Sequence, residues 1–172
     1  PWVYKIIPYR SDITIDVIIK NSEIEWDWKL ISSILDIPWS LVLELMVKYP
    51  LDWDYLSRFN GNCEDTIKFA EQNLSLPWNW TQITKRKDNN WILIDQYSYL
   101  PWDWNVIGNS RSVCWNFVIK NCNKDWNWQK LSQKEDFPIE IVRRLRDKLL
   151  DWSYLSRRKD LWNHIKYFHD KP

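Results

Sequence analysis

An all-α solenoid of about seven two-helix repeats is the fold that this sequence predicts. Three observations support it: Trp-x-Trp recurs along the whole chain, the copies lie about 24 residues apart, and apolar residues within each copy recur at helical spacing. Aligned on the second aromatic residue of the motif, successive anchors lie 24, 25, 27, 24, 24 and 24 residues apart. The anchors are Tyr4, Trp28, Trp53, Trp80, Trp104, Trp128 and Trp152.

The tryptophans keep to fixed phases of this repeat. All 15 fall at the anchor, two residues before it, or at a bulky position midway between anchors. A Trp side chain buries on the order of 150–250 Å², so two or three in each copy can hold very short helices together. We therefore expect a Trp-rich core that contains Trp26, Trp28, Trp53, Trp78, Trp80, Trp102, Trp104, Trp126, Trp128 and Trp152.

A short helix is predicted to begin at each anchor. Asp or Asn precedes the anchor in six of the seven copies, and such a side chain caps a helix by accepting an otherwise unpaired backbone N–H. The residue three positions after the anchor is Ile or Leu, which puts two apolar side chains on one helix face. Ser or Thr often follows, and we take it to mark the end of the helix.

A longer helix is predicted before each short one, around the bulky position midway between anchors. Pro38 and Pro138 stand where its first turn should be, a place that suits proline. A strand is the main local alternative, but the apolar residues recur at three and four rather than two. The capping residues expected for these longer helices are Asp12, Asp36, Asp65, Ser112, Asp136 and Asp160.

One repeat domain over residues 1–172 follows from this pattern. A two-helix unit of this size cannot bury its own apolar face, so neighbouring units must stack to form the core. The chain also begins and ends nearly in phase with the repeat, at Pro1 and Pro172. We therefore expect it to be a segment of a longer repeat protein.

Composition excludes several classes of protein. No stretch of about 18 apolar residues occurs, so no membrane span is expected. A formal net charge of +1 argues against a strongly basic nucleic-acid binder. The cysteines Cys63, Cys114 and Cys122 are odd in number and irregularly spaced. They indicate reduced thiols and an intracellular rather than secreted protein.

Neither a catalytic set nor a metal or cofactor site is expected. His164 and His169 are the only histidines, and their spacing of five does not put two ligands on one helix face. The cysteines have no nearby histidine in sequence to act as a base. The chain has only two glycines and no Gly-rich phosphate loop. We therefore predict a protein that is not an enzyme.

Charge is distributed unevenly along the chain. Residues 1–55 hold five Lys/Arg and nine Asp/Glu, a net of −4, whereas residues 137–172 hold nine and five, a net of +4. A solvated polar face, a phosphate-binding patch and contact with an acidic protein all fit the basic end. The candidate binding residues there are Arg143, Arg144, Arg146, Arg157, Arg158 and Lys159.

The stretches 76–80, 100–104 and 124–128, which read Leu-Pro-Trp-Asn-Trp, Leu-Pro-Trp-Asp-Trp and Lys-Asp-Trp-Asn-Trp, resemble a known repeat class. They are similar to the Trp-x-Trp tandem repeats in predicted proteins of giant DNA viruses. Unit length and helix pattern also resemble the leucine-rich-repeat variant, a solenoid of alternating α and 3₁₀ helices. The resemblance implies a viral protein, located in the host cytoplasm or the virion, and no transferable activity.

The function predicted from these features is a non-catalytic scaffold for protein–protein interaction. Its partner is expected to be another protein or further repeats of the same protein, because a solenoid offers a long surface and no catalytic motif is visible. Two alternatives stay open. One is nucleic-acid binding through the basic C-terminal repeats, and the other is a structural role in a viral particle.

Overall fold

The structure, a computed structural model, describes residues 13–145 and 147–160. Regular secondary structure in these residues consists of α-helices alone, with no strand. Contacts between Cα atoms divide the chain into two compact units, residues 1–102 and 103–172, and each is described by itself. The all-α prediction is therefore confirmed for the described residues, and the strand alternative is wrong there.

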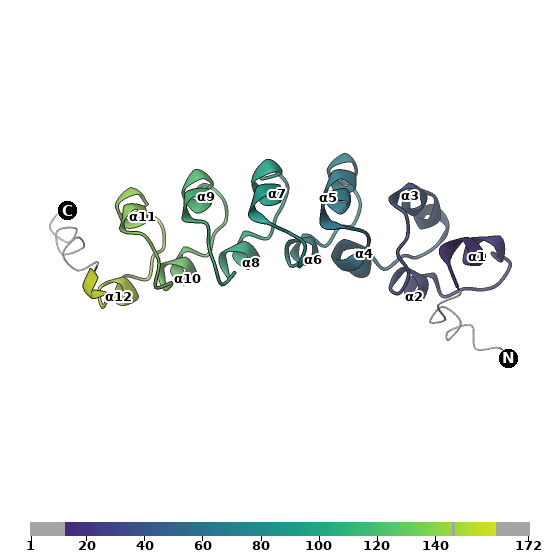
Figure 1. Cartoon of the computed structure of the whole chain (residues 1–172), viewed down its shortest axis with the longest axis horizontal. Coiled ribbons are helices and arrows are strands. Elements are labelled where there is room, and N and C mark those ends of the chain that lie inside the picture. The colour runs from purple at the N-terminus through teal and green to yellow at the C-terminus, as the bar shows by residue number, and fades with distance from the viewer. Residues whose placement is uncertain (1–12, 146, 161–172) are drawn as a thin grey trace. The chain divides into compact units, whose positions relative to one another are not determined.

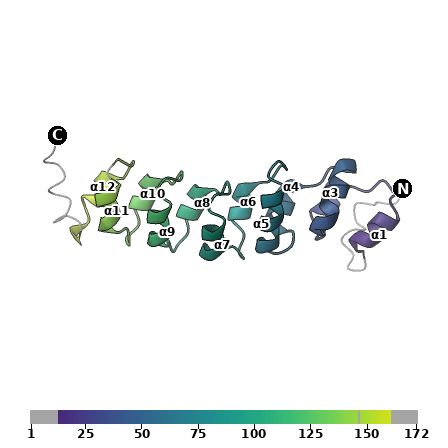
Figure 2. The same cartoon turned by 90° about the horizontal axis from the view of Figure 1, so that it is seen from above.

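Unit 1 contains seven helices in its described residues. In Figure 1, α2, α4 and α6 follow one another along one side of this unit, and α3, α5 and α7 along the other. The view from above in Figure 2 keeps the same order. The helices are α1 (Ile15–Lys20), α2 (Trp28–Ser32), α3 (Trp39–Lys48), α4 (Trp53–Phe59), α5 (Cys63–Gln72), α6 (Trp80–Thr84) and α7 (Trp91–Gln96).

Unit 2 contains five helices in its described residues. The short helices α8, α10 and α12 lie on one side of the unit and α9 and α11 on the other (Figure 1). Their bounds are α8 (Trp104–Gly108), α9 (Trp115–Lys120), α10 (Trp128–Ser132), α11 (Ile139–Arg144) and α12 (Trp152–Leu155).

Every even-numbered helix begins at an anchor tryptophan, as the sequence predicts. The Asp or Asn before it is the N-cap, and its side chain accepts the backbone N–H three residues later at 2.9–3.1 Å. The predicted capping column is thus confirmed in all six described short helices. Such a cap matters most in a helix of four to seven residues, where few backbone N–H groups are bonded within the helix.

The longer helices also begin where expected, but their predicted caps are wrong. Five of the six start at the bulky midway residue, and α5 starts four residues earlier, at Cys63. Their N-caps are Thr14, Pro38, Asn62, Asn90, Cys114 and Pro138. Asp12 lies outside the described residues, as does the body of the helix predicted after Asp160.

The acidic and hydroxyl residues expected as caps have other positions. Asp65 lies inside α5, where its backbone N–H donates to the side-chain oxygen of the N-cap residue Asn62 at 2.8 Å. Asp136 lies two residues before Pro138, the N-cap of α11, and therefore does not cap that helix. Its carboxylate instead accepts the indole N–H of Trp115 at 2.9 Å. Asp36 and Ser112 likewise lie two residues upstream of the N-caps of α3 and α9. Proline rings at two of the N-caps leave those helices without a side-chain cap.

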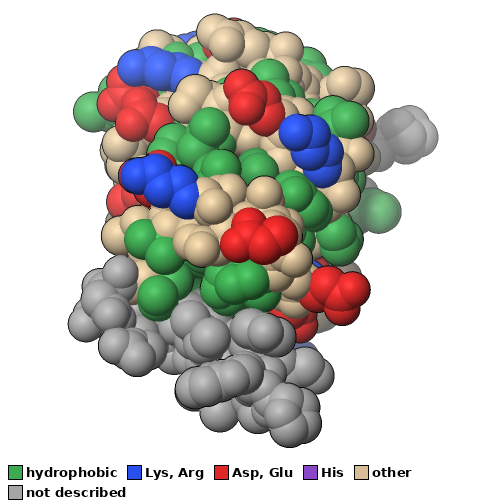
Figure 3. All heavy atoms as spheres, turned by 90° about the vertical axis from the view of Figure 1, so that its right-hand side faces the viewer, with side chains coloured by type: hydrophobic (Ala, Val, Ile, Leu, Met, Phe, Trp, Pro, Cys, Tyr) green, Lys and Arg blue, Asp and Glu red, His purple; other side chains and the backbone are tan. Residues whose placement is uncertain are grey.

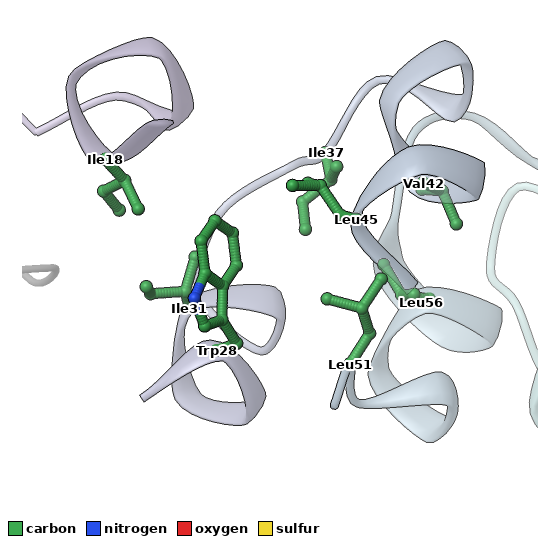
Figure 4. Packing of buried hydrophobic residues seen from close by; sticks show 8 residues of the cluster. All are labelled: Ile18, Trp28, Ile31, Ile37, Val42, Leu45, Leu51 and Leu56. Carbon is green, nitrogen blue, oxygen red and sulfur yellow. The ribbon is translucent and has the colours of Figure 1, made fainter. Parts of the chain in front are cut away.

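The core of unit 1 is shared between successive helix pairs. Figure 4 shows side chains from α1 and α2 directed toward those from α3 and α4, so that no pair buries its apolar face alone. Trp28 stacks on Tyr49 with ring centroids 4.0 Å apart, and Trp53 meets Trp78 edge to face at 5.2 Å. The cluster drawn contains Ile18, Trp28, Ile31, Ile37, Val42, Leu45, Leu51 and Leu56.

The ten tryptophans predicted for the core are all at least partly buried. Trp28, Trp78, Trp102, Trp104, Trp126 and Trp128 are buried, and Trp26, Trp53, Trp80 and Trp152 are half-buried. The tryptophan two residues before the anchor has a fixed partner: its indole N–H donates at 2.8–2.9 Å to the carbonyl five residues upstream. Trp26, Trp78, Trp102 and Trp126 share this bond. The acceptor is the C-cap residue of the preceding longer helix.

In three copies, a serine in the last turn of the short helix links that helix to the next repeat. The Oγ atoms of Ser32, Ser57 and Ser132 accept the backbone N–H of Asp52, Asn79 and Asp151 at 2.6, 3.0 and 2.8 Å. All three serines are fully buried. The residue that receives the link is the N-cap of the following short helix, so one hydroxyl fixes the start of the next unit.

A second link comes from the loop that follows the short helix. Asn60 exchanges two hydrogen bonds with the backbone of Ile37, at 2.7 and 2.8 Å. In the same way Arg86 donates to the carbonyls of Asn60 and Gly61, and Lys134 to that of Ser110. These hydrogen bonds and the others between separate helix pairs join residues that are 18 to 28 positions apart in the sequence, which is close to the repeat length.

Candidate interaction surface

The basic residues singled out in the sequence lie around α11 and α12 in unit 2. Arg143 and Arg144 are exposed in the last turn of α11. Arg157 and Lys159 are exposed in the segment after α12, and Arg146 lies outside the described residues.

Arg158 differs from these neighbours because its guanidinium is bonded within the protein. It donates to the carbonyls of Lys134 and Phe137 at 3.3 and 3.1 Å and pairs with Asp160 at 2.6 Å. Phe137 precedes α11, so this link holds Arg157 and Lys159 near the beginning of that helix. Arg143 is in its last turn, about 9 Å farther along at 1.5 Å per residue. The structure thus places the candidate residues at two ends of α11.

The same Arg-Lys-Asp sequence occurs at Arg86, in unit 1, with the same structure. Arg86 donates to the carbonyls of the preceding loop and pairs with Asp88 at 3.2 Å, and its side chain is only 3% exposed. Asp88 also accepts the backbone N–H of Cys63 at 2.7 Å. These bonds to Arg86 and Cys63 lower the pKa of Asp88, against the opposing effect of its burial. The arginine of this motif is therefore a structural residue at both sites.

A polar hollow of about 530 Å³ lies on unit 2. Its lining comes from three successive short helices or the segments that lead into them. Asn105 belongs to α8, residues 123–129 lead into and begin α10, and residues 147–149 precede α12. Trp126 and Trp128 also line it, although both are buried for more than nine-tenths of their surface.

The amides of this hollow recur at fixed positions of the repeat. Asn105 and Gln129 each directly follow an anchor tryptophan, and Asn123 lies five residues before one. These three side chains are exposed and make no hydrogen bond within the described part of the chain. Asn127 uses its Oδ1 atom to cap α10. The hollow therefore presents side-chain amides, each with a donor and an acceptor, that the protein itself does not engage.

The charges around the hollow balance one another. Lys124 and Lys148 contribute two positive charges, and Asp125 and Asp147 two negative ones. The Nζ atom of Lys124 lies 5.5 Å from the ring centroid of Trp104, a cation–π contact that holds the lysine over the aromatic ring. The hollow is thus polar without being strongly charged, unlike a phosphate-binding groove.

Unit 1 has a smaller hollow of about 160 Å³ between α1 and α3. Ile19, Leu41 and the stacked Trp28 and Tyr49 line it, with Glu44 and Lys48 among its polar residues. On the face of the molecule drawn in Figure 3, acidic and basic side chains are interspersed with hydrophobic ones. This face offers no patch of a single charge in its described residues.

The three thiols differ in exposure, and Cys63 is the buried one. Cys63 is buried, and that burial raises its pKa to about 11, so the group stays protonated at neutral pH. Cys114 is exposed and Cys122 half-buried, and all three are free. In the described residues no group of His, Cys, Asp and Glu side chains is arranged to hold a metal ion. His164 and His169 lie outside the described residues.

Sequence reasoning did not single out Asn105, Asn123 or Gln129. A signal was present, since the residue after the anchor is polar in all six described copies: Lys29, Asp54, Thr81, Asn105, Gln129 and Ser153. However, a polar residue at a helix surface is expected whether its side chain faces a ligand or only solvent, so polarity alone does not identify a binding residue.

Comparison of the chain with protein-family models, with curated proteins and with solved structures found no match. No helix among the described residues combines the length and apolar character needed to cross a membrane.

Proposed function

We propose that this chain is a non-catalytic repeat scaffold that binds a protein partner in the polar hollow of unit 2. The observation behind the proposal is the set of unengaged amides there, at Asn105, Asn123 and Gln129. A side-chain amide matches the peptide group, because each carries one carbonyl acceptor and at least one N–H donor.

The architecture proposed with this function is an α-solenoid of seven two-helix repeats with a Trp-rich core. Two features support it. The hydrogen bonds between helix pairs span one repeat length, which is the nearest-neighbour pattern of a solenoid. The links also recur with the same residue types in both units, since serine hydroxyls and the arginine of the Arg-Lys-Asp sequence act in each.

A protein fits the hollow better than a nucleic acid because of its charge. Phosphate groups would gain from Lys124 and Lys148 but would be repelled by Asp125 and Asp147. Hydrogen bonding to the neutral amides does not require a charged partner. A polypeptide segment without large net charge is therefore the ligand class that the hollow favours.

The test is a selection from a phage-displayed library of random peptides on the purified chain. Binders are counted again on the double variant Asn105→Ala/Gln129→Ala, whose changes are confined to exposed side chains. We expect enriched peptides that lose binding to the double variant and keep it to the matched control Lys29→Ala, at the same repeat position in α2. No enrichment, or binding indifferent to the double variant, would exclude the hollow as the binding site.

A second candidate function is nucleic-acid binding by the exposed side chains of Arg143, Arg144, Arg157 and Lys159. The charges lie in one unit and face solvent at both ends of α11. The check is binding to labelled single- and double-stranded nucleic acid across a salt series. Affinity that falls steeply with salt and disappears on charge reversal at Arg143, Arg144 and Arg157 would establish this function, and salt-indifferent binding would dismiss it.

A further inference from the structure

The loop between α4 and α5 contains the only Asn-Gly pair of the sequence, Asn60-Gly61. Glycine has no side chain to shield its backbone nitrogen, so that nitrogen attacks the side-chain amide of a preceding asparagine more readily than the nitrogen of any other residue does. In the folded protein both polar atoms of the Asn60 side chain are bonded to the backbone of Ile37, at 2.7 and 2.8 Å, and Asn60 is 1% exposed. The fold therefore restrains the side chain of an intrinsically reactive pair.

The indole of Trp39 lies beside this pair with its N–H unused. The Nε1 atom of Trp39 is buried and has no hydrogen-bond partner within the described residues. A Cβ atom built on Gly61 would lie 3.5 Å from this nitrogen. A buried donor without an acceptor costs stability, so a new acceptor formed at this place would be favoured.

Unit 2 shows which acceptor suits such an indole. The Nε1 atom of Trp115 donates at 2.9 Å to the carboxylate of Asp136, 21 positions along the chain. Trp39 and Asn60 are also 21 positions apart, and Trp39, like Trp115, is the first residue of a longer helix. Asn60 and Asp136 each lie three residues before the start of the next longer helix, α5 or α11. Asn60 thus occupies the place of Asp136, with an amide where unit 2 has a carboxylate.

We propose that Asn60 is a site of deamidation, and that the aspartate formed there accepts the Trp39 indole N–H as Asp136 accepts that of Trp115. The nitrogen of Gly61 attacks the side-chain carbonyl carbon of Asn60, so a C–N bond forms and the bond from that carbon to Nδ2 breaks. The proton of the Gly61 N–H leaves with Nδ2 as ammonia. Water then opens the cyclic imide at the side-chain carbonyl and returns a proton to the Gly61 nitrogen, and the new acid ionises to a carboxylate.

Arg86 offsets the charge that this reaction creates in a buried place. Its guanidinium, which Asp88 shares, donates to the carbonyls of Asn60 and Gly61 at 3.3 and 2.6 Å, and its side chain is only 3% exposed. A buried carboxylate is tolerated when it is paired and hydrogen-bonded, and the guanidinium and the Trp39 indole provide both. The bond that Nδ2 donates to the Ile37 carbonyl is lost, so deamidation changes the link between these two helix pairs.

The first experiment measures the deamidation rate of each asparagine by mass spectrometry, for the full chain folded and in urea. We expect Asn60 to be the first asparagine modified in urea. In the folded protein it should react at least about tenfold more slowly, because the bonds to Ile37 must open first. Gly61→Ala should slow the reaction in urea, where the fold plays no part. Equal rates in the two states, or another asparagine ahead of Asn60 in urea, would overturn the assignment of the site.

The second experiment uses Asn60→Asp, which carries the aspartate product from the start. In ¹⁵N–¹H NMR spectra the indole N–H signal of Trp39, identified by its loss in Trp39→Phe, should move downfield relative to the unmodified protein. Asn62→Asp is the matched control, because it adds the same charge two residues away at an exposed N-cap and should leave this signal in place. An unmoved signal in Asn60→Asp, an equal shift in both variants, or failure of Asn60→Asp to fold would overturn the proposed partner.

A double-mutant cycle separates the bond gained from the bond lost. Asn60→Asp removes the donor to Ile37 whatever residue 39 is, so only the coupling between positions 39 and 60 reports the indole bond. Trp39→Phe should lower the urea midpoint more in the Asn60→Asp background than in the unmodified one, and equal losses would overturn the indole bond. Neither experiment involves the hollow of unit 2, so failure here leaves the proposed function untouched.

Discussion

The Oγ atom of Ser132 accepts the backbone N–H of Asp151 at 2.8 Å, and this bond ties the end of α10 to the N-cap of α12. The hydroxyl donates in turn to the carbonyl of Gln129 at 2.9 Å, so a buried side chain has both of its functions satisfied. Each partner is a backbone group, which makes the bond independent of the other side chains of the unit.

Replacement of Ser132 by alanine should lower the free energy of unfolding by about 1–3 kcal/mol, because it leaves the Asp151 N–H without its acceptor. Urea denaturation followed by Trp fluorescence measures the change. Ser112→Ala, at an exposed serine of the same unit, is the matched control and should change stability by less than about 0.5 kcal/mol. Equal effects of the two substitutions would show that the inter-repeat bond contributes nothing.

Gly108, at the end of α8, occupies a position that is serine in four of the other copies and threonine in one. Its φ is not in the left-handed region, and an added Cβ would meet Trp126 and Leu131 at 3.4 and 3.5 Å, ordinary contact distances. Gly108→Ala should stabilise the protein by about 0.4–1 kcal/mol, by restricting the unfolded chain. Gly108→Ser should add the hydroxyl link toward Asn127 and so unfold at higher urea than Gly108→Ala. A serine variant less stable than the alanine variant would contradict this.

Two adjacent arginines should behave in opposite ways. Arg158→Ala removes charged hydrogen bonds to the Lys134 and Phe137 carbonyls and should cost about 1.5–3 kcal/mol of stability, whereas Arg157→Ala should be nearly neutral. Thermal unfolding by circular dichroism compares the two. Arg158→Lys should recover only part of the loss, because a lysine cannot reproduce the planar fork. Similar melting temperatures for both alanine variants would contradict the structural assignment of Arg158.

Stability near the acid end of the pH range should depend on Asp151. Hydrogen bonds from Ser153, then Gln133, then the Tyr154 backbone lower the pKa of this carboxyl from 3.8 to about 2. A depressed pKa in the folded state means that the contribution of Asp151 is present above pH 3.8 and is lost as the pH falls toward about 2. Asp151→Asn keeps a side-chain oxygen that can cap the helix, as Asn79 and Asn127 do. In this variant the free energy of unfolding should depend less on pH over the same range. The measurement is the urea midpoint of both proteins at several pH values in this range. If the midpoint of the variant changes with pH as steeply as that of the unmodified protein, Asp151 is not the source of the acid dependence.

The cysteines should differ in how readily they are alkylated. Cys114 is exposed and should be alkylated first by iodoacetamide at neutral pH, whereas Cys63 is 1% exposed with a pKa raised to about 11 and should react only on unfolding. Since the thiol is held protonated in the folded state, its contribution to stability is present below pH 9 and is lost as the pH rises toward about 11. Mass spectrometry of partly labelled protein identifies the order, and Cys63→Ala should remove the alkaline loss. Early labelling of Cys63 would contradict its burial.

Interactions within a few residues of one another were predictable from the sequence. The start of each short helix follows from Asp or Asn beside a tryptophan, because the capping bond reaches only to the third residue on. The longer helices were located correctly by their apolar spacing, but not their caps. Asp136 looked like a capping residue, yet its carboxylate binds the Trp115 indole, 21 residues away in sequence.

The sequence by itself determined the repeat, the helical character of the described residues and the tryptophan phases, because these depend on local spacing and on side-chain size. Only the tertiary structure decided what Ser132, Arg158 and Gln129 do. Ser132 and Arg158 bond backbone groups about one repeat away, whereas Gln129 faces solvent in a hollow that several helix pairs build together. In the sequence, all three are polar residues at repeated positions. Their spacing along the chain does not show which atoms of the neighbouring repeat lie within hydrogen-bonding distance of each side chain.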